Sequence, residues 1–292
     1  MFVSEYDAFG PWIYEVDENH PLSPLFVPYY KEDRNCLMII KIPRNIERRN
    51  ADPSMDLYDY VVALYEDYIY MLKRIGKNVE ESRFFYKDIE GIEDLRQILD
   101  GTLTLYLKNA KLIISYNTVS SDIIMKLTRI VRERYTGRDF NIKRDYYDEN
   151  INIDNLYINL LKNIKSNDQD IQISAVQSSI PLKLLKGSIT EMFEHFISGT
   201  VLLNTLHLTN NKELIIITRG RSFKKNRVVN YDFSITYIPF ENLKSIMISN
   251  YEKYSELVEL NLKLTEKEFR FYFEQTNNKS IDFYNNISNI LY

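Results

Sequence analysis

Two stretches of this chain, far apart in the sequence, repeat one pattern of apolar and polar positions. In the first stretch apolar side chains recur at i, i+1, i+4, i+7 and i+8, at Ile123, Ile124, Leu127, Ile130 and Val131. The same spacing returns near the other end, at Phe283, Tyr284, Ile287, Ile290 and Leu291. Because residues three and four apart lie on one side of an α-helix, each stretch is predicted to form an amphipathic helix.

Short runs rich in aromatic and β-branched residues precede both predicted helices, and such runs are typical of β-strands. The runs before the first helix are 57–64, 68–72, 82–86, 92–98, 102–107 and 112–114. Those before the second helix are 200–208, 214–217, 228–235, 243–248, 257–264 and 269–273. Turn residues such as Gly76 separate neighbouring runs, and no helical pattern intervenes within either set. We therefore expect antiparallel sheets.

A short motif that leads into the middle strands is also repeated. Residues 86–92 read YKDIEGI and residues 240–246 read FENLKSI. With the two helices, this motif predicts one small α+β fold used twice. The expected domains are residues 1–140, with a proline-containing N-terminal segment, and residues 141–292.

The sequence also predicts where two of the helices begin and end. Ser120 or Ser121 is expected to cap the first helix, and Gly137 to end it. The second domain has a helical entry segment, residues 141–199, that the first does not match. In this segment a capping box at residues 188–191 predicts a short helix that ends at Gly199.

This order of elements resembles the pleckstrin-homology superfold, a curled antiparallel meander closed by one C-terminal amphipathic helix. The motif at residues 86–92 resembles that of the bacterial branch, while residues 240–246 are similar but carry Asn242 where the first copy has Asp88. The first 50 residues and the junction lie outside the resemblance. It implies a binding module: some eukaryotic members bind phosphoinositide headgroups, and others bind proteins or oligomer partners.

Composition and charge limit the class of protein further. The chain has 292 residues, 45% hydrophobic and 27% charged, as expected of a folded protein with room for two domains. A formal net charge of −4 disfavours a general nucleic-acid binder. A single cysteine, Cys36, precludes an internal disulfide and fits a reducing compartment. With no secretory leader pattern and no run of about 18 apolar residues, we expect a cytoplasmic protein without a transmembrane segment.

Five cations within nine residues form the strongest candidate site, on a predicted hairpin: Arg219, Arg221, Lys224, Lys225 and Arg227. Such a loop can attract phosphate groups or an anionic membrane, and Phe223 within it is a candidate for insertion at an interface. The alternative is a solvated hairpin tip. In lipid-binding pleckstrin-homology domains the cationic residues usually lie on the first hairpin, whereas this loop corresponds to the second. The resemblance therefore assigns none of these residues to a ligand.

The sequence offers no pattern for catalysis. Its carboxylates lack a recognisable acid–base or metal spacing, and the three histidines, His20, His195 and His207, are scattered. No glycine-rich phosphate loop or nucleophile motif is present. We therefore expect no enzyme activity, cofactor or metal.

The predicted function is a non-catalytic interaction or scaffold module that binds a protein or peptide partner, at a sheet edge or between the domains. The alternative is peripheral binding to an anionic membrane, at its inner face, or to a phosphorylated ligand, through residues 219–227. An enzyme of unrecognised type is the third possibility. The sequence leaves the oligomeric state open.

Overall fold

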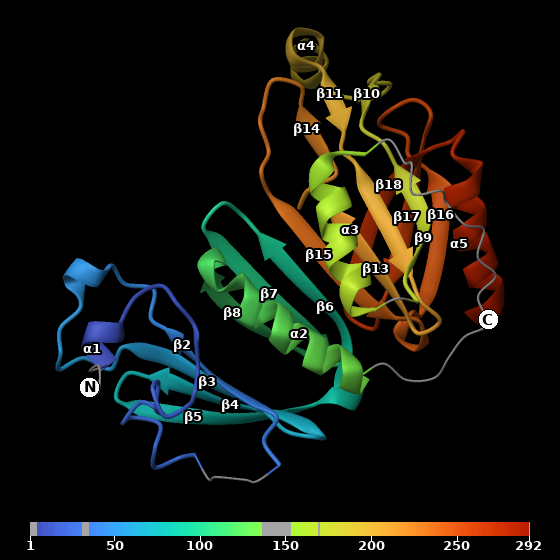
Figure 1. Ribbon diagram of the computed structural model, residues 1–292. Coiled ribbons are helices and arrows are strands. Elements are labelled where there is room, and N and C mark those ends of the chain that lie inside the picture. Colours follow the sequence, from blue (N-terminus) through green and yellow to red (C-terminus); the bar gives the residue numbers. More distant parts are fainter. Residues whose placement is uncertain (1–4, 31–34, 136–152, 169, 292) are drawn as a thin grey trace. The chain divides into compact units, whose positions relative to one another are not determined.

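The computed structural model describes residues 5–30, 35–135, 153–168 and 170–291 (Figure 1). The chain forms two compact units. Unit 1 holds residues 1–89, 99–103 and 113–135, and unit 2 holds residues 90–98, 104–112 and 136–292. The expected boundary at residue 140 and the expected helix stop at Gly137 lie outside the described residues.

Unit 1 is built on a five-stranded antiparallel sheet whose strands follow one another in chain order. Its strands are β1 (Tyr14–Glu15), β2 (Met38–Pro43), β3 (Tyr58–Leu64), β4 (Tyr68–Ile75) and β5 (Asn78–Phe85). Gly76, with φ of 65°, forms the predicted tight turn between β4 and β5. Before β2, the N-terminal segment includes helix α1 (Glu5–Ala8). A short 3₁₀ turn, η1 (Arg48–Asn50), precedes β3.

One face of this sheet is covered by the proline-containing N-terminal segment. Phe9 and Phe26 are buried in a cluster with Tyr58 and Leu72 of the sheet. Apolar residues of this segment therefore pack on the five-stranded sheet.

After β5 the chain makes a 3₁₀ turn, η2 (Tyr86–Asp88), and continues into three antiparallel strands and a helix. These elements are β6 (Ile89–Arg96), β7 (Asp100–Leu107), β8 (Ala110–Asn117), the 3₁₀ turn η3 (Thr118–Ser120) and α2 (Ser121–Tyr135). Helix α2 buries Ile124, Leu127 and Val131, as its spacing predicts.

The prediction that Ser120 caps α2 is wrong, because its hydroxyl bonds to a backbone group outside the helix. The hydroxyl of Ser120 is buried and accepts a hydrogen bond from the Ile13 N–H, with an N···O distance of 2.8 Å. The side chain of Asn117 caps the preceding turn by accepting from the Val119 N–H. Ser120 thus fixes the N-terminal segment to the start of the helix, a long-range contact that a local pattern does not encode.

Unit 2 contains a second antiparallel meander with the same order of elements. Its first four strands are β9 (Gln172–Gln177), β12 (Thr205–Thr209), β13 (Glu213–Thr218) and β15 (Phe233–Pro239), and β6 pairs with the outer edge of β15. A 3₁₀ turn, η4 (Phe240–Asn242), leads to β16 (Ser245–Asn250), β17 (Leu257–Lys263), β18 (Glu268–Glu274) and helix α5 (Asn278–Leu291). Helix α3 (Asn155–Asn167) precedes this meander.

The two repeated motifs occupy equivalent places. Counted from β2, the first meander has β5 as its fourth strand and β6 as its fifth; counted as β9, β12, β13, β15 and β16, the second has β15 as its fourth and β16 as its fifth. Tyr86 begins η2 and Phe240 begins η4, each between the fourth and fifth strands of its meander, and both side chains are buried. Helix α5 buries Phe283, Tyr284 and Ile287 against the strands of unit 2. A mixed α+β chain of mostly antiparallel sheets with a C-terminal helix is therefore confirmed.

Unit 2 also has a small three-stranded sheet inserted into its meander. This sheet consists of β10 (Ile180–Leu182), β11 (Thr200–Leu202) and β14 (Phe223–Lys225), with helix α4 (Ile189–Ser198) between β10 and β11. The prediction of one strand over residues 200–208 is wrong. The chain changes sheets at Leu203 and Asn204, whose backbone groups bond to Ser222 and to the Tyr157 hydroxyl.

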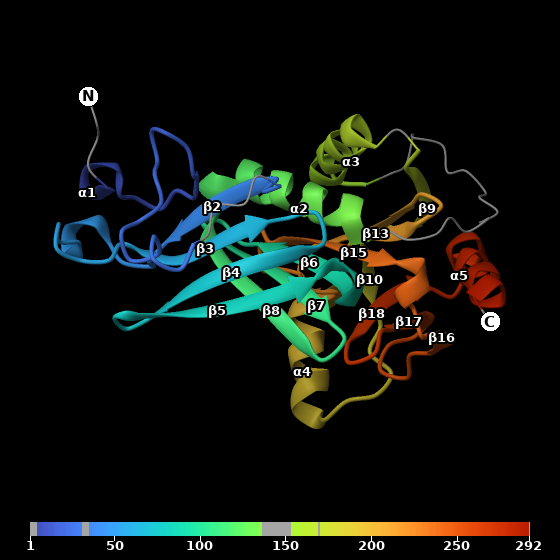
Figure 2. The ribbon, with the colours of Figure 1, turned by 90° about the horizontal axis from the view of Figure 1, so that it is seen from below.

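Helix α4 projects away from the strands of unit 2 in both ribbon views (Figures 1 and 2). Among the helices of the described residues, none combines the length and the apolar character needed to cross a bilayer.

Candidate functional site

Helix α4 has well-formed ends. The Ser188 Oγ accepts from the Glu191 N–H at 3.2 Å, and a Glu191 carboxylate oxygen accepts from the Ser188 N–H at 2.8 Å. Gly199, with φ of 62°, follows the last turn and its N–H bonds to the His195 carbonyl. The predicted capping box and stop are both confirmed.

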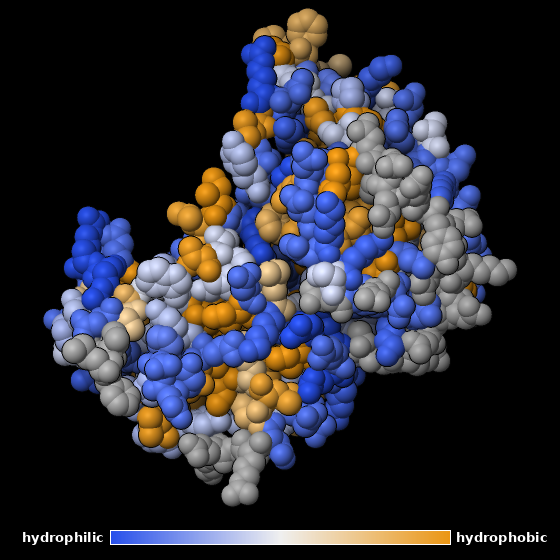
Figure 3. Space-filling model, in the orientation of Figure 1, coloured by the Kyte–Doolittle hydropathy of each residue, from blue (hydrophilic) through white to orange (hydrophobic). Residues whose placement is uncertain are grey.

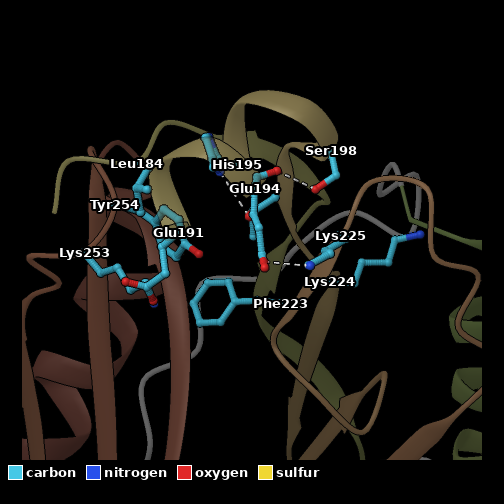
Figure 4. Close-up of a pocket in the computed structure, with 11 residues that line it drawn as sticks. Leu184, Glu191, Glu194, His195, Ser198, Phe223, Lys224, Lys225, Lys253 and Tyr254 are labelled. Atoms are coloured by element: carbon cyan, nitrogen blue, oxygen red, sulfur yellow. Dashed lines mark hydrogen bonds and ion pairs between the residues drawn. The ribbon is translucent and has the colours of Figure 1, made fainter. Parts of the chain in front are cut away.

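The polar side of α4 faces the rest of unit 2. Glu191 forms an ion pair with Lys253 at 2.8 Å, and Glu194 forms one with Lys225 of β14 at 2.8 Å. The His195 Nδ1 lies 3.1 Å from the Thr200 hydroxyl. Figure 4 shows Glu191, Glu194 and His195 on the side of α4 that looks toward these partners. The helix is thus held to its sheet by polar contacts.

The apolar side of α4 faces outward. Ile189 and Phe196 are each 88% exposed and Phe193 is 64% exposed, and Met192 and Ile197 also lie on this face. Orange apolar side chains are accordingly visible beside blue ones where α4 lies (Figure 3). A helix on the surface of a soluble protein normally buries its apolar stripe, so this helix has the reverse orientation. We call residues Ile189, Met192, Phe193, Phe196 and Ile197 the apolar face of α4.

Beneath α4 lies a cavity of about 250 Å³. Its lining residues are Leu184, Glu191, Glu194, His195, Ser198, Thr200, Phe223, Lys224, Lys225, Lys253 and Tyr254 (Figure 4). Phe223, which the sequence offered for insertion at an interface, is instead half-buried here. Its ring lies 4.6 Å from that of Tyr272 and 5.4 Å from that of Tyr254. These aromatic contacts fix β14, which is the middle of the basic segment 219–227, within unit 2.

The structure does not gather the five predicted basic residues into one free cluster. Arg219 is paired with Asp154 and lies 5.8 Å from the centre of the Tyr157 ring. Arg221 pairs with Asp232 at 3.0 Å, and Lys225 pairs with Glu194.

The other two predicted cations are less constrained. The Lys224 ammonium donates to the Val228 carbonyl at 3.0 Å. Arg227 is exposed and has no ion pair within the described part of the chain. Lys224 and Arg227 are therefore the members best able to meet an external anion.

This end of unit 2 nevertheless carries an excess of positive charge. Residues 180–202, 219–232 and 251–254 hold eight Lys and Arg side chains and four carboxylates, although the whole chain has a net charge of −4. We call these three segments the α4 end. The ion pairs use up the carboxylates, so the remaining cations give the surface around α4 a positive potential.

Electrostatics also stabilises α4 itself. The Lys253 ammonium, which donates a hydrogen bond to Glu191, and the Ser188 N–H together lower the pKa of the Glu191 carboxyl to about 2. A carboxyl with a depressed pKa favours the folded state above its ordinary pKa of 4.5, and this effect is lost as pH falls through about 2. The cap therefore remains ionised over the physiological range.

The other groups considered for catalysis are separate from one another. His20 stacks on Tyr14, and His207 is fully buried between Tyr284 and Thr205. Cys36 is half-buried, with its Sγ 3.5 Å from the Leu64 carbonyl. Within the described ranges, no three His, Cys, Asp or Glu side chains are placed to hold a metal ion.

Sequence reasoning found α4 but not the direction of its apolar face. Helical spacing indicates an apolar stripe at Met192, Phe193, Phe196 and Ile197. The spacing does not show whether another part of the protein covers that stripe. Glu191, Glu194 and His195 lie on the other side of the helix, but their lysine partners are distant in sequence: Lys225 lies 31 residues from Glu194 and Lys253 lies 62 residues from Glu191. No local pattern in the sequence could therefore show which side of α4 faces unit 2. Neither a scan against protein-family models nor a search of curated proteins finds a match to this chain.

Proposed function

We propose that this protein is a non-catalytic interaction module, composed of two pleckstrin-homology-like repeats, that attaches peripherally to an anionic membrane surface. Its contact surface is the α4 end. The apolar face of α4 lies in the interfacial region of the bilayer, and the surrounding cations meet lipid phosphates. The proposed location is the inner face of a cell membrane, where anionic lipids concentrate.

One observation carries this proposal, namely the outward apolar face of a capped helix. Five large apolar side chains on α4 are more than half exposed. Contiguous exposed apolar surface of this kind marks an interaction site in soluble proteins. Burying one such side chain contributes roughly 1.5–3 kcal/mol, so several together give a substantial driving force.

Charge favours a membrane over the protein partner predicted from the sequence. Lys224 lies in β14 and Arg227 lies just after that strand, and each cation near an anionic leaflet contributes about 1 kcal/mol. An amphipathic helix combined with basic residues supplies the two signals that stable peripheral attachment needs. The same chemistry fits lipid phosphates better than a mixed-charge protein surface.

Vesicle co-sedimentation tests the proposal. The protein is mixed with phosphatidylcholine vesicles, with or without phosphatidylglycerol, at low and at physiological salt. We compare wild type with Phe196→Ser, with the double variant Lys224→Gln/Arg227→Gln, and with Ile98→Ser as a matched control. Ile98 is 71% exposed on the turn between β6 and β7. The control variant therefore loses an exposed apolar side chain outside the α4 end.

We expect wild type to bind anionic vesicles and to release as salt rises, because screening weakens contacts between exposed charges. Phe196→Ser should bind about tenfold more weakly or worse, since about 1.4 kcal/mol corresponds to a factor of ten. The double variant should bind more weakly and depend less on salt, and Ile98→Ser should match wild type.

Two results would contradict the proposal. Equal binding by wild type and Phe196→Ser would remove α4 from the contact surface. No wild-type binding at any salt would rule out membrane attachment. A photo-reactive side chain at position 196 that then captures a protein would favour the protein partner instead.

A further inference from the structure

The pairing of β6 with β15 joins the first repeat to the second. Five antiparallel pairs run from Ile92↔Tyr237 to Arg96↔Phe233. Side chains support the pairing, since the Ser234 hydroxyl donates to Glu93 at 3.4 Å and the Arg96 guanidinium lies 5.5 Å from the Phe233 ring centre. This is a contact between the fifth strand of one meander and the fourth strand of the other.

The repeat leaves the two counterpart strands at sheet edges. The fourth strand of the first meander is β5, which ends the five-stranded sheet, and the fifth strand of the second is β16, which ends a three-stranded sheet. Within the described residues, neither pairs with a strand along its outer edge. Strand β5 is mostly exposed, whereas β16 buries Ile246 and exposes Met247, Ser249 and Asn250, with Met247 51% exposed. Figures 1 and 2 show β5 at the margin of its sheet.

Helix α5 packs beside β16, but the strand itself carries none of the residues that discourage pairing. Soluble proteins commonly protect an open edge with charged residues or proline. Strand β16 reads SIMISN and contains neither. Strand β5 carries Glu80, Glu81 and Arg83, so the two edges do not face one another with like charges.

We propose that β16 of one copy pairs with β5 of a second copy, repeating between molecules the contact that β6 and β15 make within one chain. The repeated motifs fix the register, because Tyr86 corresponds to Phe240. Ile92↔Tyr237 then becomes Ile246↔Arg83, and Arg96↔Phe233 becomes Asn250↔Val79. Met247 lies opposite Ser82, and Ser249 lies opposite Glu80.

This contact is head to tail, because it uses different surfaces on the two copies. Such contacts build a closed ring or an open filament, depending on the rotation between neighbours. Each copy adds one α4 to the assembly. The inference does not depend on what α4 binds.

Disulfide trapping tests the register. Two proteins, each with Cys36→Ser, carry Ser82→Cys and Met247→Cys respectively, and they are mixed under mild oxidation. We expect a cross-linked heterodimer. The matched control replaces Met247→Cys with Ile248→Cys, whose side chain points to the opposite side of the strand, and should give little product. Equal yields from both mixtures, or none from the first, would overturn the proposal.

A charge exchange tests the same contact without a covalent bond. Ser249→Glu places a carboxylate opposite Glu80 and should weaken self-association several-fold, as measured by sedimentation velocity over a range of concentrations. Combining it with Glu80→Lys on the second copy should restore association. Both positions are exposed, so neither change should affect folding. A wild-type protein that stays monomeric at every concentration, or an oligomer insensitive to both changes, would contradict the proposal.

Discussion

Helices α4 and α5 belong to the same unit and use their apolar stripes in opposite ways. Both place apolar side chains at helical spacing along one side. In α5 the stripe is buried up to the last turn of the helix, with Tyr284 0% and Ile287 1% exposed. In α4 the corresponding stripe includes Phe196, which is 88% exposed. The difference lies in what holds each helix to the unit.

Apolar packing holds α5, whereas ion pairs hold α4. Ile287 and Tyr284 lie in the main core of unit 2, among residues such as Phe271 and Phe273. Helix α4 is fixed through Glu191, Glu194 and their lysine partners. A helix held by its polar side keeps its apolar side available. An amphipathic pattern thus identifies an apolar stripe, and tertiary contacts decide whether that stripe is buried in the fold or left free for binding.

The largest expected effect is on stability. Ile287→Ala should lower the free energy of unfolding by about 2–5 kcal/mol, because it leaves a cavity in a packed core. Phe196→Ala should change it by less than about 0.5 kcal/mol, since the side chain is already in water. Urea denaturation of both variants measures the difference. Comparable losses would show that α4 packs in the core as α5 does.

A second effect concerns the buried contact that anchors α5. His207 accepts or donates hydrogen bonds at both ring nitrogens, to Tyr284 and to Thr205, and its burial lowers its pKa from 6.5 to about 3. Below pH 6.5 the unfolded chain binds a proton at His207 that the folded chain does not.

Stability should therefore fall by about 2 kcal/mol from this residue between pH 6.5 and pH 5. Denaturation of wild type and His207→Gln at these two pH values measures this contribution. The variant should be less stable at pH 6.5 but should lose less stability on acidification. Identical pH slopes for the two proteins would contradict the role assigned to His207.

The smallest effect concerns the start of α4. Ser188→Ala removes one half of the capping box and should destabilise the helix locally by about 1 kcal/mol. Amide hydrogen exchange in the first turn of α4 should become several-fold faster, while α5 exchanges as before. Unchanged exchange in α4 would show that the ion pairs alone maintain the helix.

Local patterns in the sequence predicted most of the local structure. The spacing of Leu127 and Ile287 identified both long helices, and Gly76 identified a hairpin turn. The paired motifs at residues 86–92 and 240–246 identified equivalent turns in the two meanders. The capping box at Ser188 located the start of α4. Each of these signals acts over a few residues, within reach of one helical turn or one tight turn.

The features that the sequence did not predict depend on contacts between residues that are far apart in the chain. Arg219 reads as part of a basic cluster, but Asp154, distant in sequence, pairs with it in the fold. Ser120 reads as a helix cap, but the Ile13 N–H occupies its hydroxyl. The edge pairing of β6 with β15 likewise depends on residues far apart in the chain. These contacts set which candidate residues remain available for a ligand, so the site was harder to predict than the fold class.

Depth-dependent fluorescence quenching tests most directly whether the apolar face of α4 enters a membrane. The chain has one tryptophan, Trp12, so Trp12→Phe combined with Phe196→Trp places a single reporter on α4. The matched protein combines Trp12→Phe with Ile290→Trp, at the last turn of α5, where Ile290 is 41% exposed.

With anionic vesicles that contain brominated lipids, we expect a blue shift and strong quenching for the reporter at position 196. Quenching should be strongest when bromine lies near the headgroup–acyl boundary, and the reporter at position 290 should be unaffected. If the protein binds vesicles but its tryptophan at position 196 stays unquenched and exposed to water, the apolar face of α4 does not enter the membrane.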